Sequence, residues 1–242
     1  MKLLKLSGLF LSAALIVASC GPKTDSAVEA TDAKEVSATD NATELAIDTE
    51  ASQVTWVGYK PSGQHNGTIP VVSGNIKVNE GTVVGGQFTF DLTNLQILDL
   101  EAGSEMHGKL FGHLQSADFF DTANFPEASF EVTGAEAYTS GVVTDAEQFE
   151  SDNTPKSNSE IMVANPTHLI SGNLTMRGVT KNITFPARVE VSEAGVSAEA
   201  RFNINRIDWG VSYGDEATVA DKAKDAFVYN TVNVGFSVKA NQ

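Results

Sequence analysis

The chain has 242 residues and a formal net charge of −15, from 31 acidic and 16 basic side chains. A chain this acidic repels phosphate groups, so nucleic acid is excluded as a partner. Cys20 is its single cysteine, and one thiol cannot form a disulfide within the chain, hold an iron–sulfur cluster or supply a redox pair.

Residues 1–19 have the pattern of a secretory signal peptide. Lys2 and Lys5 form a basic start, and the apolar run from Leu9 to Ala18 is too short to span a bilayer as a stable helix. Residues 17–20 read Val-Ala-Ser-Cys, which resembles the lipobox at which bacterial lipoproteins are cut. We therefore predict cleavage before Cys20, a diacylglycerol on its thiol and a further acyl chain, such as palmitate, on its amine. An ordinary secretory signal followed by an incidental cysteine is the alternative.

The predicted product is a lipoprotein of the Gram-negative cell envelope. Cleavage removes Lys2 and Lys5, which takes the formal charge from −15 to −17. No later apolar segment approaches the roughly 18 residues needed to cross a membrane, so the acyl chains on Cys20 would be the anchor. Residues 21–23 lack the aspartate that retains lipoproteins at the inner membrane in some bacteria. This favours the outer membrane with the domain facing the periplasm, and leaves surface exposure open.

Residues 20–45 are predicted to be an acidic, disordered linker behind the lipidated cysteine. From Gly21 onward the segment is rich in Ala, Thr, Ser, Asp and Glu, has no aromatic residue and shows no helical apolar stripe. Such a composition buries too little apolar surface to order itself. The folded domain is therefore expected to span residues 46–242.

Most of residues 46–242 alternate apolar and polar side chains with the period of two that is typical of half-buried antiparallel strands. The clearest runs are residues 87–92, 170–177, 183–191, 198–204 and 231–240. Only two segments look helical, about 104–116 and 219–226. Two short helices cannot cover a large sheet, so the sheet must bury its apolar face against itself. We predict an all-β fold, a closed antiparallel lipocalin-like barrel of about eight strands with one or two short helices.

Large apolar side chains share one phase of these strands and are the candidate lining of a cavity. No charged residue shares that phase in the strands named, so a guest there would be apolar. A core in which the same side chains pack together fits the periodicity equally well. The strand candidates are Phe88, Phe90, Phe130, Leu174, Phe185, Phe202, Ile204 and Phe236.

The helix near residues 104–116 is predicted to plug or gate one end of the barrel. Leu110, Phe111 and Leu114 recur at helical spacing on one face. Phe119 and Phe120 follow at a turn that Pro126 closes.

The segment His113–Phe130, with the sequence HLQSADFFDTANFPEASF, carries a family resemblance. Three further blocks agree in order: Trp56 with His65–Gly67, then Ser171–Pro186, then Arg201–Val211. Together they resemble the YceI-like family of polyisoprenoid-binding, lipocalin-like proteins. The resemblance implies an extended barrel that binds an apolar lipid and adds Trp56, Phe111, Leu114, Phe119 and Phe120 to the candidate cavity residues. The chain departs from the family pattern at Lys181 and Asn182, where Lys-Pro is frequent.

A polar, acidic insertion at residues 138–166 also departs from the family pattern. A solvated hairpin extension is the favoured interpretation. A calcium loop is disfavoured because the Asp-x-Asp-x-Asp-Gly frame and its terminal glutamate are missing. A loop that docks a protein partner is a further alternative, and the composition does not identify the partner.

No catalytic or metal-binding motif was found in the sequence. His107 and His113 are six residues apart, whereas two ligands on one helical face need a spacing of about four. There is no Gly-x-Ser-x-Gly elbow and no phosphate-binding glycine loop. His65, Arg206 and Asp208 are instead candidates for meeting a polar headgroup at the cavity mouth, and Arg206 and Asp208 could pair across a turn.

These observations lead to one hypothesis and two rivals. The hypothesis is a membrane-anchored lipid-binding protein, not an enzyme, that sequesters or carries a long apolar chain such as an isoprenoid, a quinone tail or a fatty compound. It needs no cofactor beyond this bound lipid. The rivals are a surface interaction module that docks through the acidic insertion, and an enzyme that acts on a barrel-bound lipid.

Overall fold

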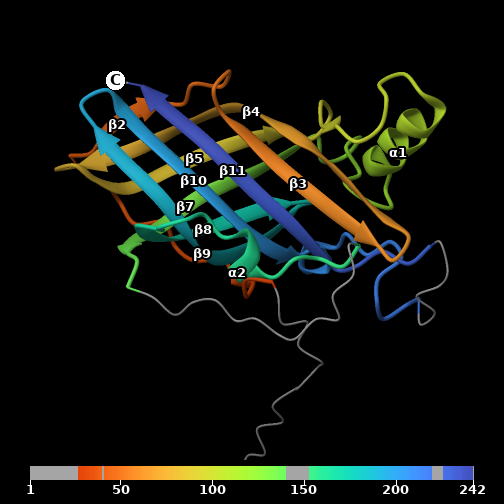
Figure 1. Cartoon of the computed structure of the whole chain (residues 1–242). Coiled ribbons are helices and arrows are strands. Elements are labelled where there is room, and N and C mark those ends of the chain that lie inside the picture. Colours follow the sequence, from red (N-terminus) through yellow and green to blue (C-terminus); the bar gives the residue numbers. More distant parts are fainter. Residues whose placement is uncertain (1–26, 40, 140–152, 220–225, 242) are drawn as a thin grey trace, which may run out of the picture.

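The computed structural model describes residues 27–39, 41–139, 153–219 and 226–241. The predicted signal peptide, Cys20, residues 140–152 of the insertion and most of the predicted helix at 219–226 lie outside these ranges. Figure 1 shows a strongly tilted sheet that curls round on itself, with a helix at one end.

Eight antiparallel strands close into a barrel, as the sequence predicted. Their order around the barrel is β9-β10-β11-β3-β4-β5-β7-β8, and β8 then pairs with β9 again. The strands are β3 (Gln53–Lys60), β4 (Gly63–Asn79), β5 (Thr82–Asp91), β7 (Glu127–Ala137), β8 (His168–Met176), β9 (Val179–Ser192), β10 (Gly195–Asn205) and β11 (Thr231–Asn241). Closure leaves the interior as the place where the apolar phase of each strand is buried.

Helix α1 (Glu105–Gln115) confirms the helix predicted at residues 104–116. Ser104 caps it by accepting a hydrogen bond from the backbone N–H of His107 at 3.2 Å. The helix follows the short strand β6 (Gln96–Ile97), which pairs with β4, and it lies at one end of the barrel. Leu114 is its buried side chain, and the partly buried Leu110 and Phe111 also pack against the core.

The prediction of disorder up to residue 45 is wrong for the described residues. Strand β1 (Thr31–Asp32) pairs with β9, and β2 (Thr43–Ala46) pairs with β4. The backbone of Lys34 exchanges two hydrogen bonds with the Asn173 side chain, at 3.0 and 2.7 Å. The composition gave the wrong prediction because it counts only apolar side chains. This segment is held instead through its backbone groups, which bind unpaired strand edges and outward asparagines.

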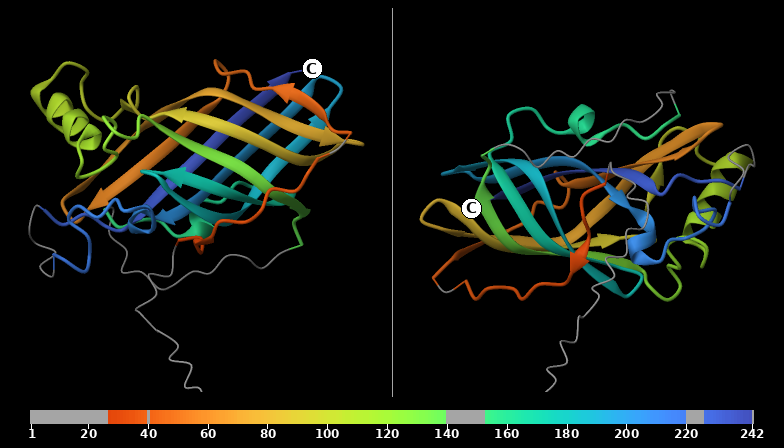
Figure 2. Two further views of the ribbon diagram at one scale, coloured as in Figure 1. Left: turned by 180° about the vertical axis from the view of Figure 1, so that it is seen from behind. Right: turned by 90° about the horizontal axis from the view of Figure 1, so that it is seen from below.

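This N-terminal arm, residues 27–47, adds to the barrel wall in two places, beside β9 and, before β3 begins, between β4 and β11. Figure 2 shows β1 and the chain that follows it running along the outside of the barrel. Ile47 forms a bridge to Ala240 of β11 and donates its N–H to the carbonyl of Gly74 on β4 at 3.0 Å. The arm is therefore part of the barrel wall, and the folded unit begins before the predicted residue 46.

The described part of the insertion also differs from the predicted solvated hairpin. Helix α2 (Asn158–Ile161) packs against β10, and Asn158 is buried. The side chain of Asn203 donates to the carbonyl of Lys156 at 2.9 Å, and the Asn233 side chain donates to the same carbonyl at 3.3 Å. Outward asparagines on adjacent strands thus hold this segment through its backbone, a contact that the acidic composition gave no reason to expect.

Candidate functional site

The barrel encloses a cavity of about 210 Å³ with an almost wholly apolar wall. All eight barrel strands contribute to it. At the α1 end, Leu114, Phe119 and Phe120 close it from one side, and Arg206, Val211 and Val228 from the other. The inward phase of the strands is therefore a cavity lining rather than a fully packed core.

The structure places twelve of the thirteen predicted cavity residues in this wall. They are Trp56, Phe88, Phe90, Leu114, Phe119, Phe120, Phe130, Leu174, Phe185, Phe202, Ile204 and Phe236. Phe111 is the exception. It lies on α1 with its ring stacked on His107 at a centroid distance of 6.3 Å, so it supports the plug from outside the cavity.

Aromatic rings concentrate on one side of the cavity. The rings of Phe185 and Phe202 stack at 4.1 Å between centroids, and Phe236 meets Phe185 edge-on at 5.6 Å. Phe130 lies 5.7 Å from Phe185 and 6.4 Å from Phe88. These rings offer flat, polarisable surfaces to a guest.

Two glycines on the inner face leave room for the rings of Phe130 and Trp56. A Cβ on Gly172 would overlap the ring of Phe130, and one on Gly67 would overlap the backbone carbonyl of Gln96 and lie 2.7 Å from Cζ2 of Trp56. A side chain at either position would therefore collide with the neighbouring ring.

Arg206 is the charged residue in the cavity wall, yet its guanidinium group is turned to the backbone. Nε donates to the carbonyl of Tyr229 at 3.0 Å, Nη1 to Val211 at 2.5 Å and Nη2 to Val228 at 3.0 Å. Burial lowers its pKa to about 10, although Asp215 and Glu216 oppose the shift. Arg206 therefore holds together the segment that covers one end of the barrel. These contacts do not fit its predicted role of binding a polar headgroup at the cavity mouth.

The other two polar candidates do not line the cavity. Asp208 is half-buried, and burial raises its pKa while Lys181 opposes the shift. The predicted pairing of Asp208 with Arg206 is replaced by the contacts of Arg206 with carbonyls. The Nδ1 atom of His65 lies 2.7 Å from Oδ2 of Asp99, which also accepts the N–H of Asn66 at 2.9 Å through Oδ1. This group fastens the chain before α1 to β4.

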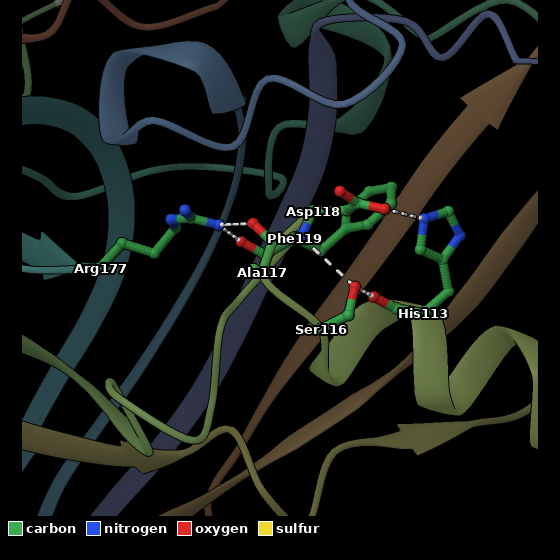
Figure 3. A network of polar contacts seen from close by, with 6 residues as sticks. All are labelled: His113, Ser116, Ala117, Asp118, Phe119 and Arg177. Carbon is green, nitrogen blue, oxygen red and sulfur yellow. Dashed lines mark hydrogen bonds and ion pairs between the residues drawn. The ribbon is translucent and has the colours of Figure 1, made fainter.

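The loop after α1, residues 116–121, carries Phe119 and Phe120 and is held by the network in Figure 3. Arg177, at the β8–β9 turn, donates through Nη1 to the carbonyl of Ala117 at 2.8 Å and to that of Phe119. Nε2 of His113 lies 3.1 Å from Oδ2 of Asp118. The His113 ring also meets Tyr213 and Phe119 edge-on, at 4.5 and 4.9 Å.

Sequence reasoning missed Arg177, Tyr213, Val211 and Val228 as parts of the site. Val211 and Val228 lie outside regular strands, so no periodicity marks them as cavity residues. Arg177 binds backbone carbonyls, and because every residue has one, the sequence does not show which carbonyls an arginine will bind. The aliphatic lining on β11, by contrast, could have been read from the alternation of Val232, Val234 and Val238.

No group of three or more His, Cys, Asp or Glu side chains among the described residues could hold a metal ion. In the same ranges, no helix has the length and apolarity to cross a membrane.

Comparison with protein families identifies the family to which this barrel belongs. Residues 45–240 match the model of the YceI-like domain. The chain belongs to the YceI-like family. The match begins within β2, so of the N-terminal arm it includes residues 45–47. No sequence among the curated proteins matches this chain.

Solved structures agree on the fold of the YceI-like domain. BcnA of Burkholderia cenocepacia aligns over 81% of this chain and 99% of its own, with 18% identity and a TM-score of 0.57. A polyisoprenoid-binding domain from Saccharophagus degradans, implicated in plant cell wall breakdown, aligns over 81% of this chain and 97% of its own. Its identity is 17% and its TM-score 0.50. At such identities the likeness concerns the fold alone.

Proposed function

We propose that this protein binds a lipid by enclosing its apolar chain in the barrel cavity. The observation that carries the proposal is a closed barrel whose interior is hollow and lined by aliphatic and aromatic side chains. An isoprenoid, a quinone tail or a fatty chain fits such a wall, and the polyisoprenoid-binding domain of S. degradans shares the fold. Sequestration or carriage of the chain is the proposed role.

The physical basis is transfer of apolar surface out of water. Burial contributes roughly 25 cal/mol per Å², so each 100 Å² of chain surface enclosed contributes about 2.5 kcal/mol before the entropic cost of binding. The wall supplies dispersion contacts without hydrogen bonds to satisfy. Affinity is therefore expected to follow the length of the apolar chain more than the chemistry of its head.

We propose further that acylated Cys20 anchors the protein in the outer membrane of a Gram-negative cell envelope. The support is the sequence of residues 1–20, with its basic start, short apolar run and lipobox. A carrier of water-insoluble chains is most useful within reach of a bilayer.

An enzymatic role finds little support among the described residues that line the cavity. The titratable side chain that lines it is Arg206, which donates to three carbonyls. The interaction-module alternative has no supporting contact either, because the described residues of the insertion pack on the chain's own β10.

Filling the cavity tests the proposal. Ala198 lines it, whereas Ser197, its neighbour on β10, faces the other side of the wall. Ala198→Phe should reduce binding of the uncharged dye N-phenyl-1-naphthylamine at least tenfold, and Ser197→Phe should leave binding unchanged. Equal dye binding by both folded variants would show that the cavity is not the binding site.

A further inference from the structure

Strands β9 and β10 separate before they end, and the seam lies directly over the cavity. Their pairing runs from Gly195↔Ser192 to Ala200↔Ala187 and stops there. Both strands continue, β9 back to Val179 and β10 on to Asn205. Ile183 and Phe185 of β9 and Phe202 and Ile204 of β10 line the cavity on the two sides of this seam.

Residues 28–32 of the N-terminal arm, here called the strap, occupy the seam. The N–H of Val28 donates to the carbonyl of Asn203 on β10 at 2.8 Å. On the other side, Thr31 and Asp32 pair with Asn182 and Lys181 of β9. Val28 and Ala30 pack against the core. The strap therefore completes the barrel wall between two strands that do not meet.

The strap is held much more weakly than the arm's second contact with the barrel. Residues 31–38 are exposed, and the ion pair between Asp32 and Lys181 joins a carboxylate whose side chain is 99% exposed. Such a pair contributes little. At the second contact, Leu45 and Ile47 are buried between β4 and β11. Local opening is therefore cheaper at the strap than anywhere the wall is made of long strands.

We propose that the seam between β9 and β10 is the lateral route by which an apolar chain enters and leaves the cavity, with the strap as a removable strand. The inference rests on the proposed lipid binding. Displacing residues 28–32 exposes a slot flanked by the stacked rings of Phe185 and Phe202, which meet an incoming chain first. The strap closes the slot again by re-forming backbone hydrogen bonds with β9 and β10.

A reversible cross-link across the seam tests this route. Thr31 and Asn182 are direct cross-strand partners, a geometry that a disulfide can span. The test variant combines Thr31→Cys and Asn182→Cys in the full chain with Cys20→Ser. Oxidation should slow its release of N-phenyl-1-naphthylamine at least tenfold, and reduction should restore the release rate. The matched control is Thr175→Cys with Thr180→Cys, a cross-strand pair that joins β9 to β8 on its other edge and therefore does not cross the seam. Its release rate should not change.

A second variant acts in the opposite direction. Val28→Pro removes the N–H that donates to Asn203 and should speed release severalfold in a protein that remains folded. Release that is unaffected by the oxidised seam disulfide would overturn the route and indicate exchange past α1 instead. If the parent protein binds no dye, the proposed function itself fails, and the route fails with it.

Discussion

At the residue scale, the inner face of the barrel depends on where side chains are missing as much as on which are present. Gly172 lies beneath the ring of Phe130, which in turn contacts Phe185 in the aromatic wall. Any side chain at residue 172 must push this ring toward the cavity. The identity of a single small residue thus shapes the binding space.

Gly172→Ala should lower the free energy of unfolding by about 1–3 kcal/mol, the usual range for overpacking. Gly134 on β7 is the control, because a Cβ there would meet its nearest neighbour, Cβ of Ser171, at 3.9 Å. Gly134→Ala should change stability by less than about 0.5 kcal/mol. Urea unfolding measures both, and equal stability of the two variants would contradict the packing described.

At the element scale, α1 and the loop that follows it form a plug tied to the barrel by a few polar contacts. Arg177 supplies two of them, both to loop carbonyls. Arg177→Ala should raise amide hydrogen exchange in residues 116–121 at least tenfold. Arg188→Ala, which removes an outer-surface ion pair with Glu199, should leave that exchange unchanged. Equal protection in both variants would mean that Arg177 does not hold the loop.

The attachment before α1 should weaken in acid. Burial disfavours the ionised form of Asp99, but the Asn66 N–H and the His65 ring outweigh it and leave its pKa below the usual value. A lowered pKa contributes stability above the unfolded-state value of about 3.9, and this is lost as pH falls through the folded-state pKa. Asp99→Asn should therefore be less stable than the parent at pH 6, and the difference should shrink as the pH falls below about 3.9. Thermal unfolding across this pH range measures the stability difference between the two proteins. A difference that does not change with pH would contradict the stabilising role of ionised Asp99.

The sequence predicted elements wherever a periodic pattern exists. Alternation located the strands and the inward aromatic row, and helical spacing located α1. The strap, the docked insertion and the Arg177 contacts were missed because they use backbone groups, which every residue carries. Arg206 was misassigned for the same reason, since its partners are three carbonyls.

At the scale of the whole molecule, the arm shortens the tether that the sequence suggested. The chain is docked on the barrel from Val28 onward, so residues 21–27 separate it from Cys20. Seven residues span at most about 25 Å. If Cys20 is acylated, the barrel works close to the bilayer surface, and the seam beside Val28 is held nearest to the anchor.

Cys20→Ala should release the protein from membranes without impairing the barrel, because the cavity and the anchor are separate parts of the chain. Fractionation should find the variant soluble, and its dye affinity should match that of the parent. A soluble variant that no longer binds dye would show that anchor and cavity depend on each other.

The central claim is that the barrel holds an apolar chain. Native mass spectrometry of the gently purified protein tests it most directly, with Ala198→Phe as the matched empty form. We predict that the parent carries a stoichiometric apolar lipid that dissociates on unfolding, and that the variant carries little or none. A parent protein of bare polypeptide mass, or equal lipid in both forms, would contradict the account.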